Sequence, residues 1–265
     1  MIPLQIHERD SPNHGPRKNP ARIDMLVFHY TGMTSAEAAL ARLCDPGAKV
    51  SAHYVVEEHG RIWRLVPETR RAFHAGRSCW EGESDLNSVS IGIEIVNPGH
   101  EWGYRAFPEA QMVSVELLCL ELMSRHPIPP HRVVGHSDIA PDRKSDPGEL
   151  FDWPRLAAAG IGIWPPAEPP APEFAIDGAQ WLVDLAAIGY CVAAGCYEAA
   201  LVAFQRRFRP ARCDGRLDLE TGSRLAEVRA AFAGSRGASG KPALDVEVQN
   251  SLQPLKVNRA VPDSR

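Results

Sequence analysis

The strongest constraint on the fold of this chain is an alternating pattern at residues 90–96. Isoleucine recurs at every second position, with Gly92 and Glu94 in between. Successive side chains of a strand point to opposite faces, so this pattern predicts a strand whose isoleucines enter an apolar core. Glu94 is therefore expected on the opposite face, away from the apolar side.

Other apolar runs lead into histidines. The run that starts at Met25 reaches His29, and a short run of valines leads to His136, which is followed on the same loop by Asp146. Two histidines and one aspartate can hold Zn²⁺ and leave its fourth position open for water, as a hydrolytic zinc site requires. A single histidine at a strand end is also consistent with a hydrogen-bonded structural residue. Asp138 is the competing carboxylate, which can instead cap the loop or orient a ligand.

The rest of the first 164 residues alternates between strand and helix patterns. The predicted elements are a helix from Thr34 to Cys44, strands at 53–57 and 61–66 around a turn at His59-Gly60, and a helix from Pro108 to His126. Thr34 and Glu37 have the spacing of a capping box. Strands mixed with helices predict an α/β domain, a mixed central β-sheet flanked by helices, with polar groups gathered over one edge.

Proline marks the expected domain boundary. We predict an extended lead-in at 1–20, a catalytic domain at 21–164, a Pro-rich linker at 165–173, a small all-α three-helix domain at 174–235 and a disordered tail at 236–265. The prolines favour a stiff, extended linker. Because the small domain has no cluster of His, Asp and Glu, we expect it to hold substrate or shape the cleft, with a purely structural role as the alternative. We expect a fragment of residues 1–166 to keep the metal and the chemistry.

Composition narrows the partners and the location. A formal charge of −4 gives no reason to expect nucleic acid, and no apolar run has the length of a membrane span. No signal sequence or lipidation cysteine is visible near the start, which favours the cytoplasm, or the envelope if an upstream start exists. The cysteines have no paired spacing and are expected to be reduced, with Cys191 bonded to Cys196 or Cys213 as the less favoured alternative.

Several short blocks in this chain resemble the N-acetylmuramoyl-L-alanine amidase type 2 family, in its AmiD/AmpD-like branch. They are residues 25–32, 51–54, 72–76, 90–97, 133–148 and 160–165, in the family's order. Dispersed blocks in the right order are far more specific than a lone histidine motif. Separately, residues 203–208 followed by Asp214-Gly215 resemble a peptidoglycan-binding three-helix module.

The resemblance implies a role for particular residues. It assigns Zn²⁺ to His29, His136 and Asp146, the general base to Glu94, oxyanion stabilisation to Lys144, and substrate binding to Tyr30, His53, Trp63, His74 and Asn97. The implied reaction is hydrolysis of the amide between N-acetylmuramic or anhydro-muramic acid and L-alanine of peptidoglycan fragments, in cell-wall recycling. The sequence indicates no protein partner. The alternatives are a muropeptide-binding or sensing protein without turnover and a zinc hydrolase for another amide.

Overall fold

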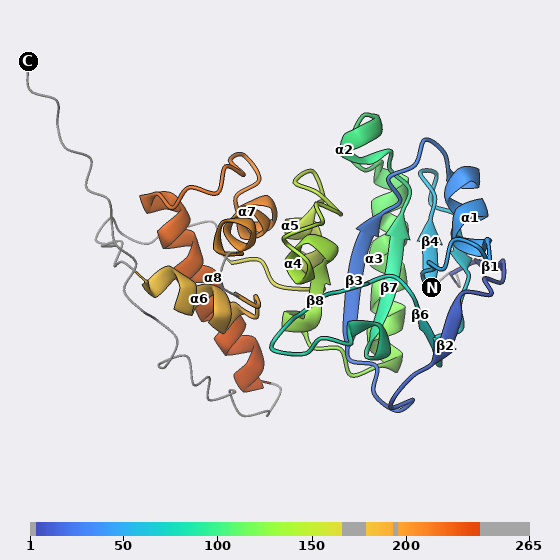
Figure 1. Ribbon diagram of the computed structural model, residues 1–265, viewed down its shortest axis with the longest axis horizontal. Coiled ribbons are helices and arrows are strands. Elements are labelled where there is room, and N and C mark those ends of the chain that lie inside the picture. The colour runs from blue at the N-terminus through green and yellow to red at the C-terminus, as the bar shows by residue number, and fades with distance from the viewer. Residues whose placement is uncertain (1–3, 166–178, 193–195, 239–265) are drawn as a thin grey trace, which may run out of the picture.

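The computed structural model describes residues 4–165, 179–192 and 196–238 (Figure 1). Its strands are β1 (Ile6–Glu8), β2 (His14–Pro16), β3 (Met25–Tyr30), β4 (Tyr54–Val56), β5 (Ile62–Arg64), β6 (Arg70–Ala72), β7 (Ser90–Ile95) and β8 (Val133–Gly135). Its α-helices are α1 (Ala36–Cys44), α2 (Gly99–Trp102), α3 (Glu109–Arg125), α4 (His136–Ile139), α5 (Trp153–Ala158), α6 (Gln180–Ile188), α7 (Tyr197–Phe208) and α8 (Leu219–Ala238). Two 3₁₀ turns, η1 (Leu86–Ser88) and η2 (Pro130–Arg132), precede β7 and β8.

A mixed sheet in the order β1-β5-β4-β7-β3-β8 forms the centre of the structure, so the α/β prediction is confirmed. β3 pairs in parallel with both β7 and β8, while β4 and β5 form the predicted antiparallel hairpin. The isoleucines of β7 pack with Leu26 and Phe28 of β3 in a core that α3 covers. His29 and Glu94 are register partners on the other face, which the alternation predicts.

One local prediction needs correction, and three short strands were not predicted. The first helix is capped by Ser35, whose hydroxyl accepts a hydrogen bond from the Ala38 amide (3.2 Å), and not by Thr34. The predicted extended lead-in contains two short strands that were not predicted, since β1 pairs with β5 and β2 pairs with β6. β6 was also not predicted. β1, β2 and β6 are three residues long and have no alternating apolar pattern, so they depend on their partners for stability.

Helices α6, α7 and α8, with the described residues that join them, such as Tyr190 and Cys191, form what we call the helical module. The module shares a core with the sheet. Apolar side chains of the module, among them Leu185, Phe204 and Phe232, belong to one buried cluster with Met25 and Val27 of β3. The module lies on the β8 side of the sheet (Figure 1). The predicted linker, Pro165 excepted, and the tail beyond Ala238 lie outside the described residues, and α8 extends past the predicted end at 235.

A disulfide joins Cys79 to Cys191, with an S–S distance of 2.02 Å, so the expectation of reduced cysteines is wrong for this pair. The two residues are 112 positions apart, and neither alternative partner considered for Cys191 is the right one. Spacing along the chain carries no information about such a pairing, because the fold alone brings the two sulfur atoms together. None of the helices in the described ranges combines the length and apolar character that a membrane crossing needs.

The shared core leads to a prediction about truncation. A fragment of residues 1–166 exposes Met25, Val27 and Val134, which are fully buried in the whole chain. Burial of each such side chain contributes about 1.5–3 kcal/mol, so we expect the fragment to melt about 10 °C or more below the full chain and to bind a hydrophobic dye. Thermal unfolding followed by circular dichroism measures this. A fragment with the melting temperature of the full chain would restore the view of an independent catalytic domain.

Candidate metal and catalytic centre

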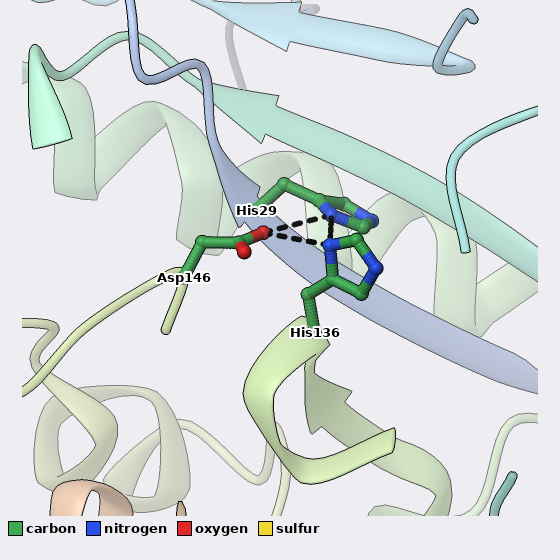
Figure 2. A group of neighbouring side chains, drawn as sticks. All are labelled: His29, His136 and Asp146. Atoms are coloured by element: carbon green, nitrogen blue, oxygen red, sulfur yellow. Dashed lines mark hydrogen bonds and ion pairs between the residues drawn. The ribbon is translucent and has the colours of Figure 1, made fainter. Parts of the chain in front are cut away.

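Three buried side chains converge at the carboxyl ends of β3 and β8 (Figure 2). His29 is near the end of β3, His136 is the first residue of α4, and Asp146 follows on the loop after α4. The Nδ1 atoms of the two histidines are 2.9 Å apart, and Oδ2 of Asp146 lies 3.0 Å from His29 Nδ1 and 2.9 Å from His136 Nδ1. The structure thus brings together the three residues that the sequence suggested as ligands.

A chain of hydrogen bonds fixes the orientation and tautomer of His29. Ser90 donates its hydroxyl proton to the Leu86 carbonyl (2.6 Å), so its oxygen accepts from His74 Nε2 (3.1 Å). Nδ1 of His74 then carries no proton and accepts from His29 Nε2 (3.0 Å). Neutral His29 therefore presents the lone pair of its Nδ1 to the cluster.

His136 is fixed in the same way. Its Nε2 is 3.1 Å from the carbonyl oxygen of Ala75, which can only accept, so this nitrogen carries a proton. Its Nδ1 faces His29 and Asp146. The two Nδ1 atoms and the Asp146 carboxylate thus point at one another, an arrangement that suits a metal ion with nitrogen and carboxylate ligands.

Electrostatics favours the protonation states that metal ligands require. Burial, together with the neighbouring His136, lowers the pKa of His29 to about 4. Burial opposes ionisation of Asp146, but His136 and His29 outweigh it and hold the pKa of Asp146 far below its usual range. At neutral pH His29 is therefore uncharged and Asp146 is ionised, so neither must lose a proton to bind a metal.

Glu94 stands beside the cluster as a different kind of carboxyl group. Its Oε2 atom is buried and has no hydrogen-bond partner among the described residues. Burial raises the pKa of Glu94 well above its usual range, the charge of Asp146 raises it further, and Lys144 lowers it. A carboxyl group of this kind can accept and hold a proton near neutral pH, as a general base must.

Gly92 lies on the same strand face as Glu94 and leaves room for the ring of His74. A Cβ atom added at Gly92 would lie 2.4 Å from that ring.

A cavity of about 370 Å³ opens over the cluster. Its wall includes Glu94 and three cationic side chains, Arg42, Arg143 and Lys144. Lys144 is exposed on the loop that carries Asp146. A cationic wall attracts anionic ligands such as peptides with free carboxylates.

The residues predicted to bind substrate fall into two groups. Tyr30 and His74 line the cavity. His53, Trp63 and Asn97 do not: His53 Nδ1 accepts from the Gly92 amide (3.0 Å), Trp63 Nε1 donates to Glu57 (2.5 Å), and Asn97 Nδ2 donates to the Arg105 carbonyl (2.7 Å). These three side chains stabilise β7, the β4–β5 hairpin and the turn after β7. Substrate contact by any of the five residues stays a prediction.

Asp138 is not in the cluster and adopts the capping alternative. Its Oδ2 accepts from the Gly135 amide (2.8 Å) and from Arg207 (2.8 Å), and its Oδ1 accepts from the Tyr190 hydroxyl (2.7 Å). No sequence pattern pointed to Tyr190 or Arg207, because both lie in the helical module, far along the chain from Asp138. Ser90 and Ala75 were missed for another reason: they act on the histidines through a hydroxyl and a main-chain carbonyl, which no residue motif reveals.

Acidification is expected to destabilise the metal-free protein. Burial lowers the pKa of His29 to about 4 and of His53 to about 3, and lowers that of His74 well below 6.5. Below about pH 6.5 the unfolded chain therefore binds up to three more protons at these sites, while Glu94, whose pKa is raised in the folded state, offsets one. The free energy of unfolding should fall by up to about 2.7 kcal/mol per pH unit towards pH 5. Denaturant unfolding at about pH 7, 6 and 5 measures this, and a pH-independent value would contradict it.

Two histidines and a carboxylate that could hold a metal ion, with a separate buried carboxyl group beside them at the carboxyl edge of a mixed sheet, are typical of a metal-assisted hydrolase. Comparison with known proteins agrees with this class. Residues 19–149 match the family model for N-acetylmuramoyl-L-alanine amidase. The chain is 40% identical over 223 residues to the N-acetylmuramoyl-L-alanine amidase AmiD of Escherichia coli K12, covering 76% of this chain and 80% of AmiD. The chain belongs to the N-acetylmuramoyl-L-alanine amidase family.

Two further relatives help to define the match. The 1,6-anhydro-N-acetylmuramyl-L-alanine amidase AmpD of Haemophilus influenzae is 35% identical over 167 residues, 56% of this chain and 89% of AmpD. Among solved structures, E. coli AmiD in complex with anhydro-N-acetylmuramic acid-L-Ala-D-γ-Glu-L-Lys has a TM-score of 0.71 at 37% identity, covering 83% of this chain and 91% of that one. AmpDh3 of Pseudomonas aeruginosa with an anhydromuramic pentapeptide has a TM-score of 0.73 at 32% identity, with coverages of 84% and 96%.

Proposed function

We propose that this protein is a zinc-dependent N-acetylmuramoyl-L-alanine amidase acting on muropeptides, including those with an anhydro-sugar. The observation that carries the proposal is the convergence of three atoms from His29, His136 and Asp146, with Glu94 beside them. Support for the substrate comes from the relatives AmiD and AmpDh3, whose structures hold anhydro-muramyl peptides. The cationic cavity wall is suited to the carboxylates of such peptides.

The residues of the site have different roles in the proposed hydrolysis. His29, His136 and Asp146 would hold the zinc ion, and the bound ion would supply Lewis-acid activation of a water molecule and of the amide carbonyl. Glu94 takes a proton from the attacking water and delivers it to the leaving amine of L-alanine. Lys144 stabilises the negative oxygen that develops on the carbonyl carbon. Its exposed position on the cavity wall allows it to reach a bound substrate.

Mass spectrometry of the products tests this function. A defined anhydro-muropeptide, incubated with the full chain, should yield the free sugar acid and the free stem peptide, whose masses together exceed that of the substrate by one water. Cleavage should stop after treatment with a chelator and return with Zn²⁺. Binding of the muropeptide without cleavage would favour a sensing protein, and cleavage of unrelated amides at equal rates would favour a general amide hydrolase.

We also propose that the protein works in an oxidising compartment, where it acts on wall fragments during peptidoglycan turnover and recycling. The Cys79–Cys191 disulfide supports this location, because disulfides rarely persist in a bacterial cytoplasm. Because of this disulfide, the absence of paired spacing among the cysteines is no longer an argument for the cytoplasm. Alkylation of the native protein in cells, followed by peptide mass analysis, tests the proposal. Free thiols at both positions in a cytoplasmic fraction would support the cytoplasmic recycling role instead.

The resemblance of residues 203–208 to a peptidoglycan-binding module supports a second, smaller proposal, that the outer surface of the helical module contacts wall polymer. Phe204, Arg207 and Phe208 cannot make that contact in this fold, since all three are buried. Co-sedimentation of the full chain carrying Glu94→Gln with insoluble peptidoglycan, compared with chitin, tests whether the exposed remainder of the module binds. Equal recovery with both polymers would contradict it.

A further inference from the structure

The helical module reaches the metal cluster through one buried carboxylate, Asp138. Asp138, Tyr190 and Arg207 are at most 2% exposed, so water is nearly absent around their contacts. Within 2.8 Å, Asp138 accepts hydrogen bonds from the Tyr190 hydroxyl and from the Arg207 guanidinium. The module thus supplies both the opposite charge and a neutral donor to a group that lies two residues from His136.

We infer that Tyr190 and Arg207 are positioning residues for His136, so that the helical module is part of the support of the metal centre and not only an appended domain. This inference rests on the metal site proposed above. It adds to that proposal a set of contacts that no local motif in the sequence contains.

Asp138 can position His136 because α4 is short and this carboxylate caps it. This helix has four residues, and Asp138 Oδ2 caps it by accepting from the Gly135 amide (2.8 Å). The same turn anchors a second ligand, because the Ser137 amide donates to the carbonyl of Asp146 (2.8 Å). A shift of Asp138 therefore moves the backbone that presents His136 and Asp146 to each other. Contacts that orient ligands in this way contribute to metal affinity although they do not touch the metal.

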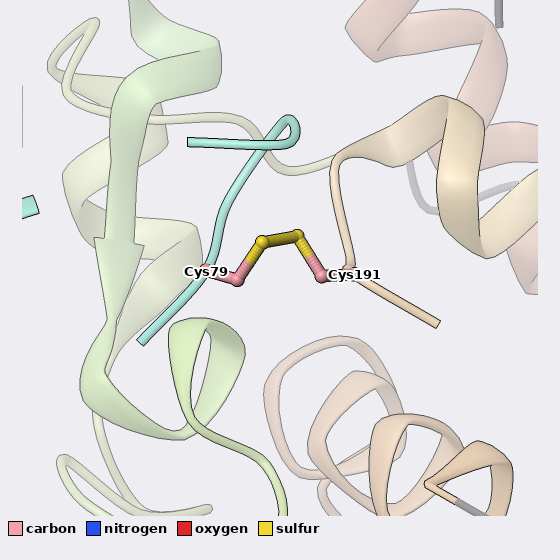
Figure 3. The surroundings of a disulfide bond; sticks show 2 residues. All are labelled: Cys79 and Cys191. Atoms are coloured by element: carbon pink, nitrogen blue, oxygen red, sulfur yellow. A yellow bond between two sulfur atoms is a disulfide. The ribbon is translucent and has the colours of Figure 1, made fainter. Parts of the chain in front are cut away.

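Two further contacts make the module rigid at this point. Arg207 also donates to the Val133 carbonyl at the start of β8 (3.1 Å), and its guanidinium lies 4.0 Å from the ring centroid of Trp153. Cys191, the neighbour of Tyr190, is bonded to Cys79 (Figure 3). The amide of Cys79 in turn donates to the Ile139 carbonyl at the end of α4 (2.8 Å). Both ends of α4 are therefore tied to segments that the module holds.

The test compares two buried tyrosines in the full-length protein. Tyr190→Phe removes one hydrogen bond to Asp138, and Tyr54→Phe removes the corresponding bond between a buried tyrosine and Glu68, at a site outside the metal cluster. We expect Tyr190→Phe to weaken Zn²⁺ affinity, measured by chelator competition, by about tenfold or more. We also expect it to alter the visible absorption spectrum of the Co²⁺-loaded protein, which reports ligand geometry. Tyr54→Phe should leave both unchanged at a similar loss of melting temperature.

Arg207→Lys provides a second variant, because it keeps the charge but loses the forked geometry. It should give an intermediate loss of Zn²⁺ affinity, and Arg207→Met a larger one. Tyr190→Phe and Arg207→Lys proteins that bind Zn²⁺ as the wild type does, with an unchanged Co²⁺ spectrum, would overturn the inference alone. A wild-type chain that binds neither ion would overturn the proposed function and this inference with it.

Discussion

Replacement of His29, His136 or Asp146 by alanine is expected to abolish metal retention and hydrolysis together. Each residue supplies one of the three converging atoms, so two ligands remain in each variant. Loss of an outer contact to a metal ligand already lowers metal affinity by about 10–100-fold, and loss of a ligand itself should exceed about a hundredfold. Metal content after dialysis, measured beside the rate of muropeptide cleavage, checks both expectations.

His59→Ala is a suitable control for these variants. Its side chain is 62% exposed and pairs with Glu57 at the β4–β5 turn, away from the cluster. We expect it to keep wild-type metal content and rate. Full hydrolytic activity in any ligand variant that has lost its metal would disprove the assignment of the centre.

Glu94→Gln is expected to separate catalysis from metal binding. Glutamine has nearly the same size but cannot take up the proton of the attacking water, so kcat should fall by about 10²–10⁴-fold. Metal content should stay at the wild-type level, because Glu94 is not one of the three converging residues. Folding should not suffer either, since burial already disfavours a charge at this position.

Parallel measurement of zinc content, muropeptide affinity and kcat distinguishes the outcomes for Glu94→Gln. Loss of zinc would show that Glu94 is a ligand. Unchanged kcat with full zinc would mean that another group accepts the proton, and His74, which also lines the cavity, is the nearest candidate by position. His74→Asn would then be assayed for zinc content and kcat together, because His74 also accepts the hydrogen bond that orients His29.

The sequence by itself determined much of the sheet and of the site. Alternation at residues 90–96 was enough to place the isoleucines in a core and Glu94 on the opposite face, because a strand has a period of two wherever it occurs. The apolar run before His29 and the valines before His136 likewise predicted that both residues follow buried strands. Such patterns involve only neighbouring residues, so they can be recognised without knowledge of the rest of the fold.

Only the tertiary structure decided how these residues act. The proton positions on His29 and His136 depend on Ser90 and Ala75, and the position of α4 depends on Asp138 with Arg207, which is 69 residues away. Cys79 and Cys191 are 112 residues apart. No periodicity links positions at such separations, since the chain between them can take any path that packs. Close packing of the helical module against the sheet selects these contacts, and the buried cluster that the two parts share follows from no pattern within either segment.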